Sequence, residues 1–99
     1  MEMTAITTTH DYGDGAGPVP AHRHPNGGGW VADSATVAES AHVGQYAQVY
    51  GTAQVYGTAQ VYGNAQVFGN AQGADTAQVS ETAQVYGNAQ VYGNAWVYG

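Results

Sequence analysis

The chain has 99 residues, which suffice for one small domain but not for a cofactor domain joined to a substrate domain. It contains one basic and seven acidic residues and has a formal net charge of −6, so it would repel nucleic-acid phosphates and anionic membrane surfaces. Cysteine is absent, which excludes disulfide bridges and thiolate chemistry, and no apolar stretch approaches the ~20 residues of a membrane helix, so we expect a soluble, cytoplasmic protein.

Residues 1–28 follow no repeat and are predicted to form an irregular N-terminal cap or arm. The run MEMTAITTTHDY favours one short strand through its threonines, and GDGAGPVPAHRHPNGGG is rich in Gly and Pro, which is typical of irregular chain. A cap has a physical purpose, because the end of a stacked β structure exposes unpaired backbone groups that invite aggregation.

Two histidines of this cap are candidate metal ligands. His22 and His24 lie two residues apart, so on an extended strand they would face the same side, and His10 or Asp11 could join them. Two imidazoles are an incomplete site, and the alternative is that the segment HRHPN is a polar turn leading from the cap to the repeats. We expect no cofactor.

A six-residue phrase repeats from residue 29 to residue 99. Ala stands at every sixth position from Ala35 to Ala95, and Val follows two residues after each Ala or its equivalent, with Gly73 as the exception. Ala and Val therefore point to one side of a strand, and the Gln and Tyr beside them point to the other. The Gly-Asn or Gly-Thr pair that follows is typical of a sharp corner. Period six does not fit a helix, so the sequence predicts an all-β solenoid.

The phrases VADSAT, VAESAH and VGQYAQ at residues 31–48 resemble the hexapeptide-repeat family of left-handed parallel β-helices. The resemblance covers about residues 29–99, and the short array without insertions resembles small phage or mobile-element proteins of this kind. It implies a left-handed triangular solenoid with three hexads per coil and about four coils. Many members are acyltransferases, but the protruding loop and C-terminal helices typical of them are absent here, so no catalytic residue can be transferred and we expect no enzyme.

Three hexads per coil would place residues eighteen apart above one another, and this register predicts an aromatic surface. We expect self-association through aromatic residues along one face and at the C-terminal edge: Trp30, Tyr50, Phe68, Tyr86, Trp96 and Tyr98. Two assemblies fit. The family resemblance implies a homotrimer packed side by side, whereas a homodimer through the C-terminal coil would also cover the open edge, and we favour the dimer.

Two phrases, at residues 71–82, break the pattern. They lose their aromatic residues, gain Asp75 and Glu81, and carry Gly73 in place of Val, which predicts a small cavity or a bulge. Asp33 and Glu39 occupy the same hexad position as Asp75 and Glu81. Either these acids are drift in a solvated repeat, or they belong to an acidic patch that binds a protein partner, formed by Asp33, Glu39, Gly73, Asp75, Ser80 and Glu81.

The function predicted from these features is that of a non-enzymatic β-helical binding protein. Its rigid acidic and aromatic surface would engage a protein partner such as a nucleic-acid-binding enzyme, as an inhibitor that imitates nucleic acid or antagonises host defence, by analogy with acidic pentapeptide-repeat proteins. One alternative is a small-molecule-binding protein with sites at subunit interfaces, built from aromatic residues and His42. The other is a degenerate acyltransferase. Direct binding to nucleic acid or to a membrane is not expected.

Overall fold

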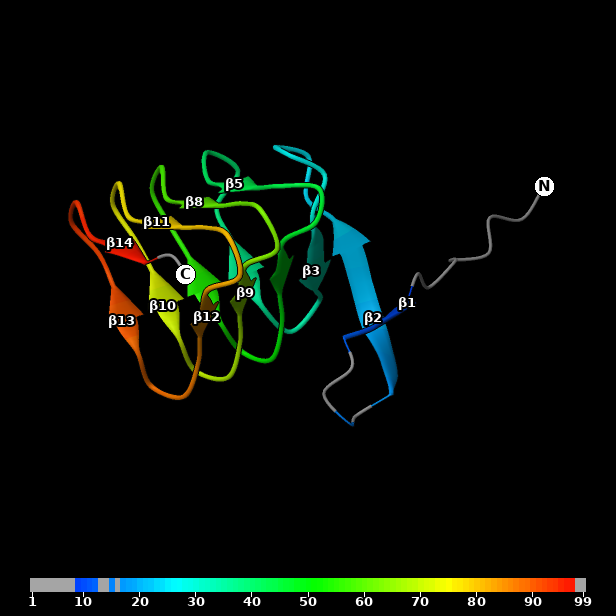
Figure 1. Ribbon diagram of the computed structural model, residues 1–99. Helices are drawn as coiled ribbons and strands as arrows, with labels where there is room; N and C mark the ends of the chain where they lie inside the picture. The colour runs from blue at the N-terminus through cyan, green and yellow to red at the C-terminus, as the bar shows by residue number, and fades with distance from the viewer. Residues whose placement is uncertain (1–8, 13–14, 16, 98–99) are drawn as a thin grey trace.

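The computed structural model describes residues 9–12, 15 and 17–97, which form strands and turns (Figure 1). None of the described residues forms a helix long and apolar enough to cross a membrane. The strands are β1 (Thr9–Asp11), β2 (Pro18–Arg23), β3 (Trp30–Ala32), β4 (Thr36–Val37), β5 (His42–Val43), β6 (Gln48–Val49), β7 (Gln54–Val55), β8 (Gln60–Val61), β9 (Gln66–Val67), β10 (Gln72–Gly73), β11 (Gln78–Val79), β12 (Gln84–Val85), β13 (Gln90–Val91) and β14 (Trp96–Val97).

The strands from β3 onward stack into three parallel sheets that form the sides of a solenoid of about four coils (Figure 1). The first sheet continues as β3-β6-β9-β12, the second contains β4, β7, β10 and β13, and the third contains β5, β8, β11 and β14. Each strand pairs with the strand eighteen residues away, as in the pairing of Gln48 with Gln66. This register confirms the all-β, repeat-based parallel solenoid with three hexads per coil, and left-handed coiling stays a prediction.

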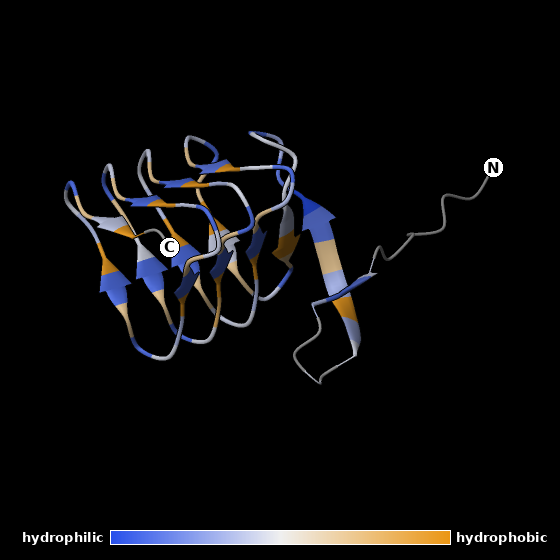
Figure 2. Ribbon diagram, in the orientation of Figure 1, coloured by the Kyte–Doolittle hydropathy of each residue, from blue (hydrophilic) through white to orange (hydrophobic). Residues whose placement is uncertain are grey.

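The core of the solenoid consists almost entirely of Ala and Val. Each short strand pairs an outward Gln, Thr, His or Trp with an inward apolar residue or Gly73, and Figure 2 shows the two kinds of residue side by side within the strands. The largest fully buried side chains are Val31, Val43, Val49, Val55, Val61 and Val67. Each such Val contributes about 1.5–3 kcal/mol relative to an exposed one.

Gly73 leaves a gap in this core. It is buried in β10 and pairs in register with Val55 of β7 and Val91 of β13, so the strand has no bulge. A Cβ atom added at Gly73 would meet no atom within 4 Å. Of the two outcomes predicted for this position, the structure shows the small cavity.

The N-terminal segment is more regular than the sequence suggested. Instead of irregular chain, residues 18–23 form β2, which pairs antiparallel with β1 and with β3 and so extends the first sheet to six strands. Pro20 is tolerated because it lies beyond Ala32, the last residue of β3, where its carbonyl accepts a hydrogen bond from the Asp33 N–H at 2.9 Å.

The glycine-rich segment after β2 covers the edge of the third sheet at β5. The Gly29 N–H donates to the Val43 carbonyl at 2.9 Å, and the Val43 N–H donates to the Asn26 carbonyl at 3.0 Å. A Cβ at Gly27 would lie 2.2 Å from the Val43 carbonyl oxygen, so only glycine permits this approach. Hairpin and loop together protect two of the three sheets at the first coil.

Candidate functional site

The acidic residues do not form the single patch that was predicted, because they lie on three different corners of the solenoid. Glu39 and Asp75 belong to one corner column, in which Asp75 packs directly below Gly57. Glu81 lies below Gly63 on the next corner, and Asp33 lies on the third. Residues that share a hexad position are spread around the coil, so only those eighteen or thirty-six apart share a corner.

Three residues of that predicted patch are either paired within the chain or buried. Asp33 forms an ion pair with His22, whose Nδ1 lies 2.7 Å from the Asp33 Oδ1. Gly73 and Ser80 are buried and cannot face a partner. The exposed acids left without an ion pair among the described residues of the solenoid are Glu39, Asp75 and Glu81.

Asp75 and Glu81 have an unusual backbone conformation, and we call these two residues the acidic corners. Their φ angles are 59° and 60°, and they are the only non-glycine residues with positive φ in the described part of the chain. The equivalent positions with positive φ are all glycine: Gly51, Gly57, Gly63, Gly69, Gly87 and Gly93. A side chain in this conformation costs about 1–2 kcal/mol. Each acidic corner therefore strains the backbone where the repeat otherwise uses glycine.

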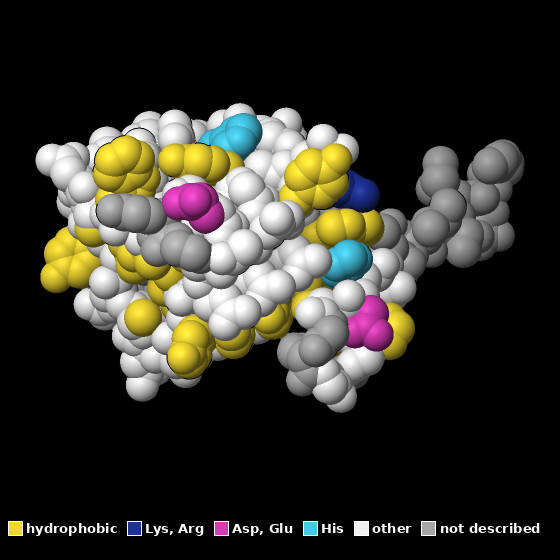
Figure 3. Space-filling view, in the orientation of Figure 1, with side chains coloured by type: hydrophobic (Ala, Val, Ile, Leu, Met, Phe, Trp, Pro, Cys, Tyr) yellow, Lys and Arg dark blue, Asp and Glu magenta, His cyan; other side chains and the backbone are white. Residues whose placement is uncertain are grey.

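The two acidic corners differ in their contacts. The Asp75 Oδ2 accepts a hydrogen bond from the Gly93 N–H of the next coil at 3.1 Å, which offsets part of its strain. The Glu81 backbone carbonyl accepts a hydrogen bond from the Asn64 N–H at 2.7 Å, but the Glu81 carboxylate makes no hydrogen bond or ion pair with any described residue. Arg23 is held elsewhere, by the Gly28 carbonyl at 3.0 Å and the Trp30 ring at 4.4 Å. On the face shown in Figure 3, the acidic side chains in view lie well apart from each other, on the solenoid and on the N-terminal hairpin.

Three of the aromatic residues predicted along one face form a column, and Tyr12 of the hairpin adds a fourth ring to it. Tyr12, Tyr50, Phe68 and Tyr86 stack with ring centroids 4.4, 4.8 and 5.3 Å apart. Tyr12 reaches this place from the end of β1 because the first sheet has only small residues there: Ala21 and Ala32. The hairpin thus builds a second apolar cluster on the outside of the solenoid.

Trp30 belongs to a different column, because it pairs in register with Gln48. Its ring stacks on His10 at 4.5 Å and on Arg23 at 4.4 Å, so it is half-buried. Tyr50 is buried under Tyr12, and in the predicted aromatic face only Tyr86 is largely exposed.

The last coil exposes apolar residues. Tyr86, Tyr92 and Trp96 are 58%, 61% and 63% exposed. Ala89 and Ala95, whose equivalents in the inner coils are buried, are also exposed. Tyr98, the sixth residue predicted to mediate self-association, lies outside the described residues.

The two candidate metal ligands contact different groups. His22 is exposed and pairs with Asp33, whereas His24 is buried and its Nε2–H donates to the Ala41 carbonyl at 2.8 Å. The described parts of the chain contain no group of three His, Cys, Asp or Glu residues able to hold a metal ion. These histidines fasten the cap to the first coil.

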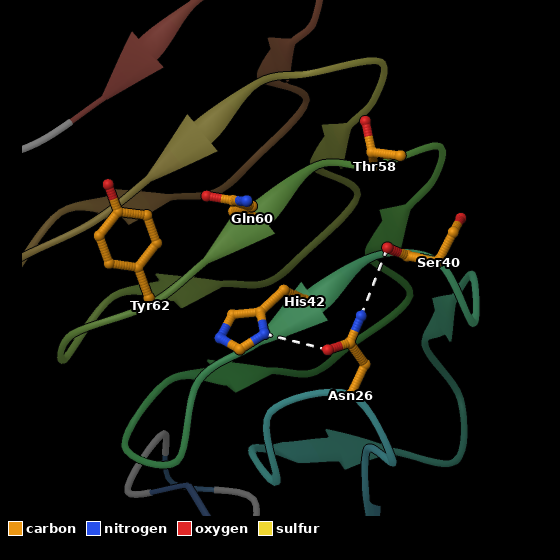
Figure 4. Close-up of a pocket in the computed structure, with 6 residues that line it drawn as sticks. All are labelled: Asn26, Ser40, His42, Thr58, Gln60 and Tyr62. Carbon is orange, nitrogen blue, oxygen red and sulfur yellow. Dashed lines mark hydrogen bonds between the residues drawn. The ribbon is translucent and has the colours of Figure 1, made fainter.

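His10 and His42 complete the histidine set. Burial lowers the pKa of His10, Arg23 lowers it further, and Asp11 opposes both. The His42 Nδ1 lies 3.2 Å from the Asn26 Oδ1 in a hollow that Figure 4 shows, and no carboxylate lines this hollow. The Asn26 amide oxygen is thus the side-chain group that orients the His42 ring.

Comparisons with known proteins identify a repeat but no close relative. The family model described as YdcK beta solenoid repeat matches residues 59–72 and 83–99. No curated protein and no solved structure matches the chain. The chain is thus a repeat-based β-solenoid, and the stretch between the two matched segments, residues 73–82, contains Gly73 and both acidic corners.

Proposed function

We propose that this β-solenoid is a non-enzymatic binding protein whose acidic corners engage a positively charged surface on a protein partner. The observation that carries the proposal is the positive φ of Asp75 and Glu81. Strained residues persist where their surroundings compensate for the strain or where function retains them. The hydrogen bond from Gly93 compensates Asp75 in part, and no hydrogen bond or ion pair to a described residue holds the Glu81 carboxylate.

The charge of the molecule defines the chemistry of that partner. With a net charge of −6 and a single arginine, the protein attracts basic surfaces, and salt screens this attraction beyond the Debye length. A nucleic-acid-binding groove is such a surface, so we infer that the protein acts as an inhibitor that occupies it. A rigid stack of coils loses little conformational freedom on binding, which favours affinity from few contacts.

The last coil supports a second part of the proposal, association with another copy of this chain. Residues 83–99 contain no charged residue, so the edge lacks the charges that usually prevent strand pairing. The partly exposed Val97 and exposed Ala95 of one copy would cover those of another. This arrangement is an end-to-end homodimer.

The experiment is a quantitative pull-down from the native cell with purified wild-type protein, Asp75→Gly and Glu81→Gly. Glu39→Gln is the matched control, because it removes one negative charge from the corner column of Asp75 without altering a residue of positive φ. We expect both glycine variants to lose a partner that the control retains, and raised salt to release that partner from the wild type. Equal capture by all four proteins would refute the proposed role of the acidic corners.

A degenerate acyltransferase makes a different prediction. Such a protein would still bind acyl-coenzyme A, and we expect titration calorimetry with acetyl-coenzyme A to show no binding to the wild type. Saturable binding would favour the enzyme hypothesis instead.

A further inference from the structure

Two hollows lie in line on the outer side of the third sheet, and together we call them the axial groove. The upper hollow is lined by Asn26, Ser40, His42, Thr58, Gln60 and Tyr62, and Figure 4 shows these side chains around it. The lower one is lined by Thr76, Gln78, Asn94 and Trp96. Both hollows lie between the same two columns of side chains. The strand column consists of successive partners in the β5-β8-β11-β14 register: His42, Gln60, Gln78 and Trp96. The corner column beside it consists of Ser40, Thr58, Thr76 and Asn94.

The amides of this groove are organised differently from those of the other two sheets. On the first sheet Gln66 donates to Gln48 at 3.5 Å and Gln84 donates to Gln66 at 3.3 Å, and on the second sheet Gln72 donates to Gln54 at 3.2 Å. On the third sheet no such bond joins Gln60 to Gln78. The Gln78 Oε1 instead accepts a hydrogen bond from the Tyr62 hydroxyl at 3.3 Å.

Because Gln60 and Gln78 do not bond to each other, side-chain donors and acceptors on the third sheet are left to face the groove. The Gln60 amide, which is exposed, and the Gln78 NH₂ group have no hydrogen-bond partner among the described residues. The hydroxyls of Thr58 and Thr76 donate to the backbone of the next coil, to Asp75 at 3.3 Å and to Gly93 at 2.9 Å. The Thr76 hydroxyl also lies 2.5 Å from the Asn94 Oδ1, whereas the Thr58 oxygen remains available as an acceptor.

The lining also restricts the class of ligand. It contains no Lys, Arg, Asp or Glu, so it offers no permanently charged side chain to a phosphate, a carboxylate or a cation. It does contain Tyr62 and Trp96, whose rings can pack against an apolar face. Amides and hydroxyls that both donate and accept, set beside aromatic rings, match a ligand with many neutral hydroxyl groups and apolar C–H faces.

We infer that the axial groove binds a neutral oligosaccharide laid along the solenoid axis. Gln60 and Gln78 exchange hydrogen bonds with its hydroxyls, and Trp96 packs against one sugar ring. The alignment of two hollows across successive coils favours a chain of sugars over a single one. This activity is separate from the proposed role of the acidic corners, neither of which lines the groove.

The test uses the full chain on an array of neutral and acidic oligosaccharides. We expect binding to neutral members, and the best of them is then titrated against Gln60→Ala and Trp96→Ala. Each variant should weaken binding about twofold to twelvefold, because one hydrogen bond or one stacked ring contributes about 0.5–1.5 kcal/mol. Gln90→Ala and Tyr92→Ala are matched controls, since both residues are exposed in the last coils outside the groove.

Three results would overturn this inference: no binding to any neutral oligosaccharide, binding to acidic members alone, or equal losses in groove and control variants. Asp75→Gly and Glu81→Gly should bind the oligosaccharide as the wild type does. Failure of the glycan test is therefore distinguishable from failure of the protein-partner proposal.

Discussion

At the scale of single residues, the two acidic corners are positions where the fold favours glycine and where we propose that binding favours an acidic side chain. The repeat uses glycine at six equivalent corners with positive φ, whereas Asp75 and Glu81 keep side chains there. These substitutions are visible in the sequence, and the prediction of a sharp corner after each strand was correct. The strain itself was missed because equivalent positions in the first coil, such as Asp33 and Glu39, have ordinary φ angles.

Replacing Glu81 by glycine should stabilise the protein. We expect the free energy of unfolding to rise by about 1 kcal/mol, because the positive φ is costly for a side chain and the Glu81 carboxylate makes no compensating hydrogen bond with a described residue. Asp75→Gly should gain less, since it loses the bond from Gly93. Chemical denaturation measures both. Gly63→Ala is the reciprocal control and should destabilise, because its Cβ would lie 2.8 Å from the Glu81 nitrogen.

Filling the gap at Gly73 should also stabilise the fold. Gly73→Val restores the side chain that the repeat places there, and we expect about 1–2 kcal/mol from the filled cavity. A thermal melt provides the measurement. Gly44→Val should act in the opposite direction, because a Cβ at Gly44 would lie 3.2 Å from Tyr62. A loss of stability in Gly73→Val would mean that the cavity is not open to a side chain.

At the scale of elements, the strands and the hairpin differ in how far sequence could predict them. A strict repeat fixes each short strand locally, so every hexad was located correctly. The pairing of β2 with β3 follows no period, and Gly and Pro around residues 15–29 favoured irregular chain. The position of Tyr12 above Tyr50 depends on that pairing and was therefore missed as well.

Acid should loosen the hairpin through His10. The Gln48 Nε2 donates to its Nε2 at 3.0 Å, so this nitrogen must be unprotonated, and burial lowers the pKa of His10 below 6.5. The unfolded chain then binds the proton first, and stability falls as the pH decreases below about 6.5 until folded His10 also protonates. Unfolding midpoints across this range should decline less for His10→Phe, which keeps a ring on Trp30. Parallel profiles for the two proteins would rule out this role for His10.

At the scale of the whole molecule, the two ends of the solenoid are unlike. The hairpin and loop protect the first coil, while the last coil exposes Ala89, Ala95 and three large aromatic side chains. Composition and repeat length predicted the stack and its apolar edge. The grouping of the acids into a single patch was wrong, because the three-fold geometry of the coil separates residues that share a place in the repeat.

End-to-end association should be sensitive to one charge at that edge. Ala89→Lys would place a buried cation in the proposed dimer, and we expect sedimentation to give half the wild-type mass. Asn88→Lys, at the neighbouring exposed corner, should leave the mass unchanged. A dimer that survives Ala89→Lys, or a wild type with the mass of a trimer, would favour side-by-side packing.

The most direct test of the account combines stability and binding in the double variant Asp75→Gly, Glu81→Gly. Thermal unfolding and partner capture are measured on the same preparation, with wild type alongside. The account predicts a higher unfolding midpoint together with loss of the captured partner. A higher midpoint with capture unchanged would contradict it, because the strained acids would then serve neither the fold nor the binding.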